Sequence, residues 1–232
     1  MYRHFAFVFI LSISLTNGAV TWTGSSSTDI FDGANYEGLA DGLVLAPNVT
    51  IDDDVTFQNA TVTIPQVAAQ QRFQVGAGKT ITFDGSTVSL SGGSNDGVGG
   101  APGSSLPNGT AGPSLDIIGG SSFEAFFIVN GVQMNVDGTS SATLAGAGNP
   151  VNISTINLET GATLSFTRET IPQFNTEHLS KLTINGLAAQ EGVNYTIDAL
   201  GTTGSIITAI PEPSVTLFGA LGATLLLLRR RR

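Results

Sequence analysis

Between residues 20 and 210, hydrophobic and polar residues alternate in short segments separated by Gly, Asn and Asp. Alternation with a period of two is typical of a β-strand with one buried face, and Gly, Asn and Asp are typical turn residues. Thr, Ser, Val and Ile dominate these segments, and no long stretch places apolar residues at helical spacing. The pattern therefore predicts an all-β body.

Several of these segments are repeated along the chain. VTFQNATVTI (residues 55–64) aligns without a gap with ITFDGSTVSL (residues 81–90), at an offset of 26. MNVDG (134–138), INLETG (156–161) and LTING (182–186) share one order of apolar, polar and turn residues, at offsets of 22 and 26. The separation between Ile81 and Met134 is close to two such periods. Repetition at about 20 to 50 residues is typical of a stacked architecture.

The repeat predicts a parallel β-helix, or solenoid, in which each period forms one coil. A triplet of apolar, polar and apolar residues would place two side chains in the interior and one outside. Phe57 would then stack over Phe83, and Val62 over Val88. An antiparallel β-sandwich is the alternative, because its hairpins also alternate and turn about every 8 to 12 residues. A sandwich, however, has no reason to repeat at the longer offset seen here.

Composition divides the chain into three parts. Residues 1–19 and 211–232 flank the repetitive β-rich domain, which spans residues 20–210. Within that domain, residues 92–113 are rich in Gly, Pro and Ser and interrupt the repeat. Such a composition buries little apolar surface, so we expect a long surface loop there.

The N-terminal segment has the pattern of a secretory signal peptide. Arg3 and His4 form a positive start, residues 5–15 are apolar, and small or polar residues lead to Ala19. The apolar stretch is too short for a stable membrane span. We therefore expect export and removal of residues 1–19 by signal peptidase.

The C-terminal segment combines a short motif, an apolar stretch and a basic end. Pro211, Glu212 and Pro213 precede the uncharged residues 215–228, which would form a transmembrane helix of about 21 Å. Pro213 suits the first turn of that helix, and Glu212 complements its dipole. The last four residues would anchor the cytoplasmic end by the positive-inside rule; they are Arg229, Arg230, Arg231 and Arg232.

In their order and position, these residues resemble the PEP-CTERM sorting signal of bacterial exported proteins. The resemblance covers the segment 211–232. It implies recognition by exosortase, a cysteine transpeptidase-like membrane enzyme, and release to the cell surface or the exopolysaccharide matrix. A surface protein whose tail stays in the membrane is the other outcome. At the opposite end, VTWTGSSSTDIFDGANYEG loosely resembles the start of autotransporter-like β-helical proteins, with Tyr36 in place of an expected second tryptophan.

The negative charge of residues 20–210 excludes polyanionic partners. The basic residues between positions 20 and 210 are Arg72, Lys79, Arg168 and Lys181. Seventeen acidic residues in the same range, set against these four, give a formal charge of −13. Nucleic acid and anionic lipid head groups would repel such a body. The chain has no cysteine, so its stability must come from a core instead of disulfides.

Candidate chemistry is sparse. His178 is the only histidine after the N-terminal segment, and we expect it at the surface, so no histidine-based metal site and no cofactor are predicted. Asp52 and Asp54 would project from one side of a strand and could share a Ca²⁺, but a solvated corner is the favoured interpretation. No nucleophile or phosphate-loop motif is present.

These observations favour a non-catalytic exported protein of the cell surface or matrix. The alternative is a secreted carbohydrate-binding or carbohydrate-active protein, such as a polysaccharide lyase or glycosidase, which would need paired carboxylates or basic residues around a sugar. Carboxylates are plentiful in the sequence without being distinctive, and basic residues are few. Exopolysaccharide is a candidate partner in either case.

Overall fold

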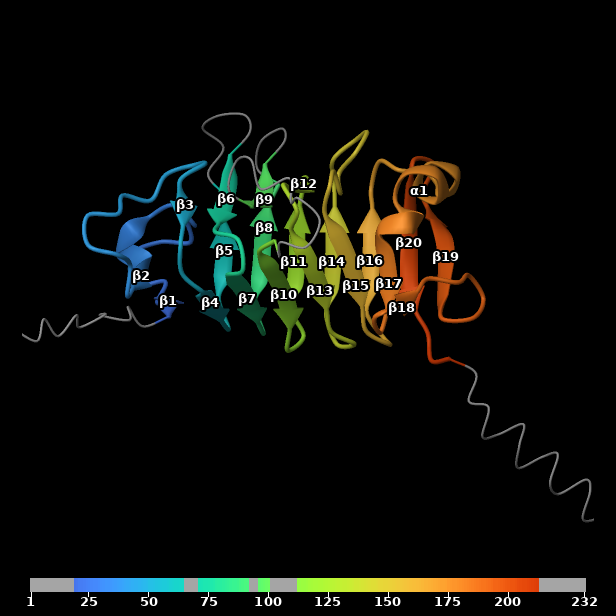
Figure 1. Cartoon of the computed structure of the whole chain (residues 1–232), viewed down its shortest axis with the longest axis horizontal. Coiled ribbons are helices and arrows are strands. Elements are labelled where there is room, and N and C mark those ends of the chain that lie inside the picture. The colour runs from blue at the N-terminus through green and yellow to red at the C-terminus, as the bar shows by residue number, and fades with distance from the viewer. Residues whose placement is uncertain (1–18, 65–70, 92–95, 101–111, 213–232) are drawn as a thin grey trace, which may run out of the picture.

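A computed structural model of the chain describes residues 19–64, 71–91, 96–100 and 112–212. Three β-sheets run along an elongated molecule, with the N-terminal strands at one end and the C-terminal strands at the other (Figure 1). Most neighbouring strands are parallel, including every pair of the third sheet. The prediction of an all-β body is confirmed.

Sheet A contains nine strands in the order β18 (Leu187–Ala188), β17 (Leu182–Ile184), β15 (Thr155–Leu158), β13 (Gln133–Val136), β10 (Ser114–Ile118), β7 (Thr80–Asp84), β4 (Val55–Gln58), β1 (Val20–Trp22) and β2 (Tyr36–Glu37). Sheet B contains seven strands in the order β19 (Tyr195–Leu200), β20 (Gly204–Ala209), β16 (Thr163–Phe166), β14 (Ser141–Leu144), β11 (Ser122–Ala125), β8 (Thr87–Leu90) and β5 (Thr61–Thr63). Sheet C contains four strands in the order β12 (Phe127–Val129), β9 (Gly97–Gly100), β6 (Arg72–Val75) and β3 (Thr50–Ile51). The helical elements are α1 (Ile171–Glu177) and the 3-10 helices η1 (Gly33–Asn35) and η2 (Leu179–Lys181).

The register of the parallel strands follows the sequence repeat. Phe57 in β4 pairs with Phe83 in β7, and their buried rings stack with centroids 4.6 Å apart. Val62 in β5 pairs with Val88 in β8, and both side chains are buried. These predicted partners are confirmed. Their parallel direction does not fit the antiparallel sandwich that was the alternative.

The spacing between Ile81 and Met134 corresponds to two steps of unequal length. Ile81 pairs with Leu115 across a long connection, and Leu115 pairs with Met134 across a much shorter one. Because the register depends on the strands and not on their connections, a long connection and a short one leave the same side chains facing inward. The predicted count of two periods is therefore right, although neither has the expected length.

The prediction of a surface loop over residues 92–113 is wrong in part. Gly97–Gly100 forms β9 in the middle of sheet C, and all four residues are buried. A Cβ atom at Gly97 would overlap the backbone carbonyl oxygen of Phe127, so the missing side chain permits a close approach of the two strands. Residues 92–95 and 101–111 lie outside the described residues.

Aromatic rings form a column through the N-terminal half of the core. Trp22 lies 5.3 Å from Phe57, Phe57 lies 4.6 Å from Phe83, and Phe83 lies 5.8 Å from Phe123, measured between ring centroids. Each residue comes from a different strand, namely β1, β4, β7 and β11. Tyr36 closes the column with an edge contact to Trp22, so the two aromatic positions of the N-terminal resemblance lie together.

Buried serines hold the turns between sheets A and B. The Ser86 hydroxyl accepts a hydrogen bond from the Ala60 backbone N–H, and the Ser121 hydroxyl accepts one from the Ser86 N–H. Ser140 repeats the arrangement with the Ser121 N–H. Each serine thus satisfies a buried backbone donor of the preceding turn, where an unpaired donor would cost stability.

Antiparallel strands cover both ends of sheet A and the C-terminal end of sheet B. At the N-terminal end, β2 pairs with β1, and at the C-terminal end β18 pairs with β17. In sheet B, β20 pairs with β16 on one side and with β19 on the other. Exposed parallel edges would offer unpaired backbone groups to other chains, and these strands occupy them.

Two predicted segments fall outside the described part of the chain. These are residues 1–18 of the expected signal peptide and residues 213–232, which hold the expected transmembrane helix and Arg229–Arg232. Within the ranges that the structure describes, no helix has the length and hydrophobicity needed to cross a membrane.

Candidate functional site

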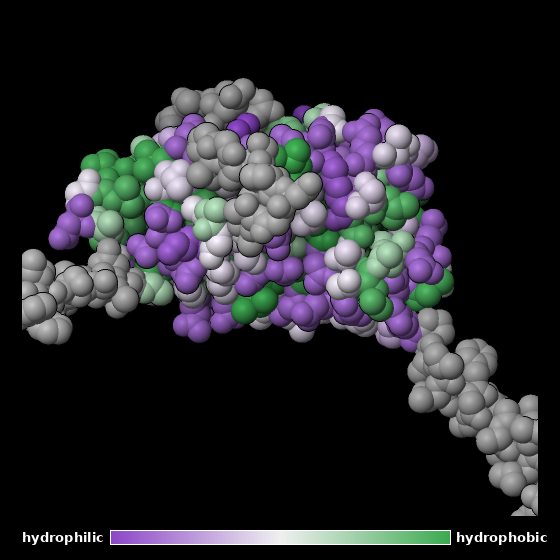
Figure 2. Space-filling view, viewed as in Figure 1, coloured by the Kyte–Doolittle hydropathy of each residue, from purple (hydrophilic) through white to green (hydrophobic). Residues whose placement is uncertain are grey.

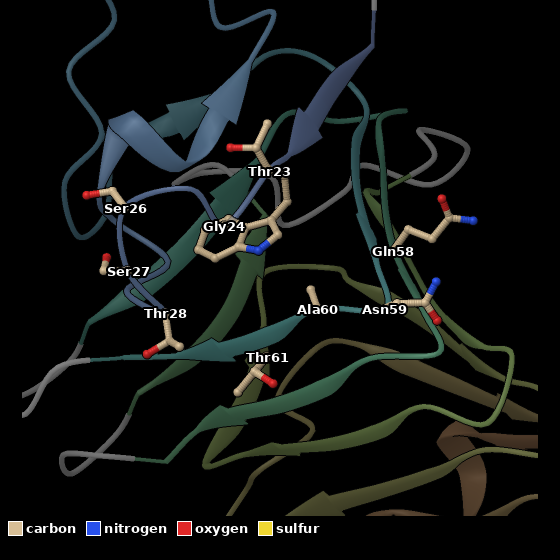
Figure 3. Close-up of a pocket in the computed structure, with 10 residues that line it drawn as sticks. Thr23, Gly24, Ser26, Ser27, Thr28, Gln58, Asn59, Ala60 and Thr61 are labelled. Atoms are coloured by element: carbon tan, nitrogen blue, oxygen red, sulfur yellow. The ribbon is translucent and has the colours of Figure 1, made fainter.

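A polar hollow of about 430 Å³ lies beside the N-terminal strands (Figure 3). Residues from the segment after β1 form one wall, and residues around the turn between β4 and β5 form the other. Its lining residues are Trp22, Thr23, Gly24, Ser26, Ser27, Thr28, Gln58, Asn59, Ala60 and Thr61. None of these side chains is charged, and most carry a hydroxyl or an amide that can both donate and accept hydrogen bonds.

Asn35 fixes the wall that follows β1. Its side-chain oxygen accepts hydrogen bonds from the backbone N–H groups of Ser26 and Ser27, at 2.8 and 2.9 Å. Its amide nitrogen donates to the Asp29 carbonyl oxygen and to the Ser27 hydroxyl. Because Asn35 is fully buried, this network gives the loop a defined shape.

Figure 1 shows α1 near the C-terminal end of the molecule. A second group of polar side chains belongs to residues in and next to this helix. Glu169 follows β16, whereas Glu177 ends α1 and His178 caps it. One ligand atom from each side chain can be chosen so that all three lie within 4.8 Å of one another. Glu169 and His178 are buried, with 0% and 1% of their surface exposed, and Glu177 is exposed.

The local sequence explains how α1 brings these groups together. Thr170 and Gln173 form a capping box, in which the Gln173 side chain accepts the Thr170 backbone N–H at 2.9 Å. The helix is therefore forced to begin directly after this cap, next to Glu169. It ends one residue before His178, whose backbone N–H donates to the Phe174 carbonyl oxygen. The His178 ring then stacks on Phe166 of β16, with centroids 5.1 Å apart.

Several polar atoms of this group have no hydrogen-bond partner among the described residues. Glu169 Oε1 accepts the Gly148 backbone N–H at 2.7 Å, but Glu169 Oε2 is buried without a partner in that part of the chain. The same holds for both ring nitrogens of His178. The nearby Lys181 ammonium donates to Asn149 Oδ1 at 2.9 Å. Leaving such atoms unpaired costs about 1 to 3 kcal/mol each.

Burial changes the acid-base properties of both buried groups. It raises the pKa of Glu169; the Gly148 N–H opposes this shift and the charge of Glu177 adds to it. It lowers the pKa of His178 to about 4, and the Lys181 charge acts in the same direction. At neutral pH, His178 is therefore an uncharged imidazole with a free lone pair.

The expectation that His178 is a surface residue is wrong. Beyond the N-terminal segment the sequence shows one histidine and no neighbouring pattern of ligands, because Glu169 is nine positions away and only the fold returns it to His178. The one feature of the sequence that points to this group is the capping pair Thr170 and Gln173, which predicts where α1 begins.

The structure places Asp52 and Asp54 in the turn between β3 and β4, and both are exposed. Asp54 Oδ1 accepts the Thr80 backbone N–H at 2.8 Å, so this carboxylate has a structural partner. Within the described residues, neither aspartate belongs to a group of three acidic or histidine side chains arranged for a metal ion. The arrangement is that of a solvated corner.

Of the predicted sorting residues, Pro211 and Glu212 are described and Pro213 is not. Both are exposed and follow β20 without regular secondary structure. Ile210, immediately before them, still donates its backbone N–H to the Asn194 carbonyl oxygen. Within the described residues, this hydrogen bond lies immediately before the motif.

Comparisons with protein-family models, with curated proteins and with solved structures each found no match.

Proposed function

We propose that this chain is an exported, non-catalytic protein of the bacterial cell surface or exopolysaccharide matrix. Residues 211–232 would act as a PEP-CTERM signal, with a membrane-anchored intermediate before processing by exosortase. The exposure of Pro211 and Glu212 directly after the last strand carries the proposal, because a membrane-bound enzyme could reach the motif without unfolding the body.

The body would be a parallel β-helix. Successive strands along the chain are assigned in turn to sheets A, B and C: β4, β5 and β6, then β7, β8 and β9, then β10, β11 and β12. Each of these three windings thus contributes one strand to each sheet, and parallel pairing stacks it on the next one. Such a body suits a durable scaffold outside the cell, where it needs neither a partner nor a cofactor to form its core.

The first test concerns the tail. In a bacterial host that produces exosortase, we expect the intact mass of the mature protein to lack the residues that follow the sorting motif, and in a host without exosortase the chain should still end at Arg232. Replacing Glu212 by alanine should preserve Arg232 in both hosts, since the motif is lost. Replacing Glu191 by alanine is the matched control, because this glutamate is also exposed but lies outside the sorting segment. It should leave processing unchanged. A mature protein that ends at Arg232 in the exosortase host would refute the sorting proposal.

Carbohydrate binding is the second candidate, and the polar hollow in Figure 3 is the observation that favours it. Uncharged hydroxyl and amide groups match the hydroxyl groups of a neutral sugar, whereas the body's charge of −13 opposes acidic sugars. Stacking on aromatic rings would contribute little, because Trp22, Tyr36 and Tyr195 are all buried. The affinity would therefore rest on hydrogen bonds.

The second test measures sugar binding by calorimetry with neutral β-glucan and acidic alginate oligosaccharides. We expect the neutral sugar alone to bind. Replacing Gln58 by alanine and Thr61 by valine removes polar groups from both ends of one wall. The double variant should weaken binding about thirtyfold, at about 1 kcal/mol for each of two lost hydrogen bonds. Gln133→Ala changes an exposed glutamine elsewhere on sheet A and is the control. Unchanged affinity in the double variant would exclude the hollow as the site, and release of shortened sugars would overturn the non-catalytic assignment.

A further inference from the structure

We propose that Glu169, Glu177 and His178 bind a divalent transition-metal ion of the Zn²⁺ class. The proposal rests on three ligand groups that gather beside α1 and on buried ligand atoms that have no other partner within the described residues. It is independent of the sorting and sugar-binding proposals, because it concerns a different part of the molecule from the hollow and the tail.

The geometry needs only a small closure to hold the ion. Tetrahedral ligands about 2.0 to 2.1 Å from Zn²⁺ lie about 3.3 Å apart. The three ligand atoms here lie within 4.8 Å of one another, so the most widely spaced pair has to approach by at most about 1.5 Å. Glu177 is exposed at the end of α1 and has room to move, whereas Glu169 and His178 are buried.

The free atoms point to a ligand and not only to a structural role. The Gly148 backbone N–H donates a hydrogen bond to Glu169 Oε1, so Oε2 is left to bind the metal. This arrangement is typical of metal-binding carboxylates, whose second oxygen is oriented by an outer hydrogen bond. Uncharged His178 offers the lone pair of one ring nitrogen to a metal while its ring plane is fixed by stacking on Phe166. A metal ion would pair with Glu169 Oε2 and one ring nitrogen of His178, two buried atoms that have no partner in the described part of the protein.

The chemistry of the set favours one class of ion. Two carboxylates and an imidazole suit Zn²⁺, whereas Ca²⁺ requires six to eight oxygen ligands. The combined negative charge of two carboxylates also exceeds the positive charge of the nearby Lys181 ammonium, which is hydrogen-bonded to Asn149. The three protein ligands leave a fourth position for water. The bound ion would join the segment after β16 to the end of α1.

The experiment uses the full chain without a histidine tag, purified in a mild nonionic detergent and freed of metal with a chelator. Titration with ZnCl₂ is followed by calorimetry, and the bound metal is counted by mass spectrometry. We expect one Zn²⁺ for each chain with a Kd in the micromolar range or lower, and a higher melting temperature with Zn²⁺ because the ion binds the folded state. CaCl₂ should produce neither effect.

Two variants test the assignment without depending on folding. Glu177→Gln changes an exposed side chain and should weaken Zn²⁺ binding by about tenfold or more, equivalent to about 1.4 kcal/mol. Glu169→Gln should abolish binding while leaving the metal-free melting temperature unchanged or higher, since it removes a buried carboxylate. Glu191→Gln and His4→Asn are the controls, because they alter an exposed carboxylate and the only other histidine. Absence of binding at millimolar ZnCl₂, or binding that only His4→Asn removes, would overturn the proposal.

Discussion

Replacing Gly97 by alanine should destabilise the protein by about 3 kcal/mol or more, or prevent folding altogether. The new Cβ atom would coincide with the carbonyl oxygen of Phe127 in the adjacent strand β12. That oxygen belongs to a backbone that is paired along β9, so it cannot rotate away as a side chain would. The strands would have to separate, and the hydrogen bond from the Gly97 N–H to the Gln71 carbonyl oxygen would be strained on the other side.

Urea denaturation followed by circular dichroism measures this effect. Gly33→Ala is the matched control, because a Cβ atom there meets no heavy atom within 4 Å and the residue lies in η1. We expect the control to change the unfolding free energy by less than about 0.5 kcal/mol. Equal stability of the two variants would show that β9 does not pack against β12 as described.

Replacing Phe83 by alanine should cost about 3 to 5 kcal/mol. Its ring is fully buried and lies between those of Phe57 and Phe123, at centroid distances of 4.6 and 5.8 Å. Removing it would leave a cavity in the middle of the column, and backbone pairing on both sides of β7 would prevent the strands from collapsing into it. The lost ring contacts add to the lost burial.

The same unfolding measurement tests this variant. Val44→Ala is the control, because Val44 is 78% exposed and should contribute little. Phe83→Leu should fall between the wild-type chain and Phe83→Ala, since it restores part of the volume. A loss below about 1 kcal/mol in Phe83→Ala would contradict a tightly packed column at this position.

The pairing of the repeated residues was predictable, because the offset between two repeats gives the register of the parallel strands directly. Phe57 and Phe83 occupy equivalent places in two similar segments, and parallel pairing brings equivalent places together. The buried glycine strand was not predictable in the same way. The composition of Gly97–Gly100 indicates that the segment has little apolar surface to bury. It does not indicate that the Phe127 backbone lies too close to Gly97 for any side chain there.

The group beside α1 was missed for another physical reason. Its members become neighbours only through the capping box at Thr170 and the packing of α1, and neither determines a ligand spacing in the sequence. A lone histidine among polar residues is usually exposed, whereas packing against Phe166 and Phe174 buries His178, and this burial keeps it uncharged at neutral pH. The antiparallel strands at the ends were also unforeseen, because alternation does not encode strand direction.

Those terminal strands determine how the body can associate with other molecules. At both ends of sheet A and at the C-terminal end of sheet B, the parallel stack stops against a strand of opposite direction. A second copy therefore finds no parallel edge at these three places on which to continue the stack. Under the proposed function, adhesion to a matrix would use side chains along the flanks of the molecule, as they are displayed in Figure 2. At these three places, a second molecule added end to end would have to pair in the antiparallel direction with β2, β18 or β19.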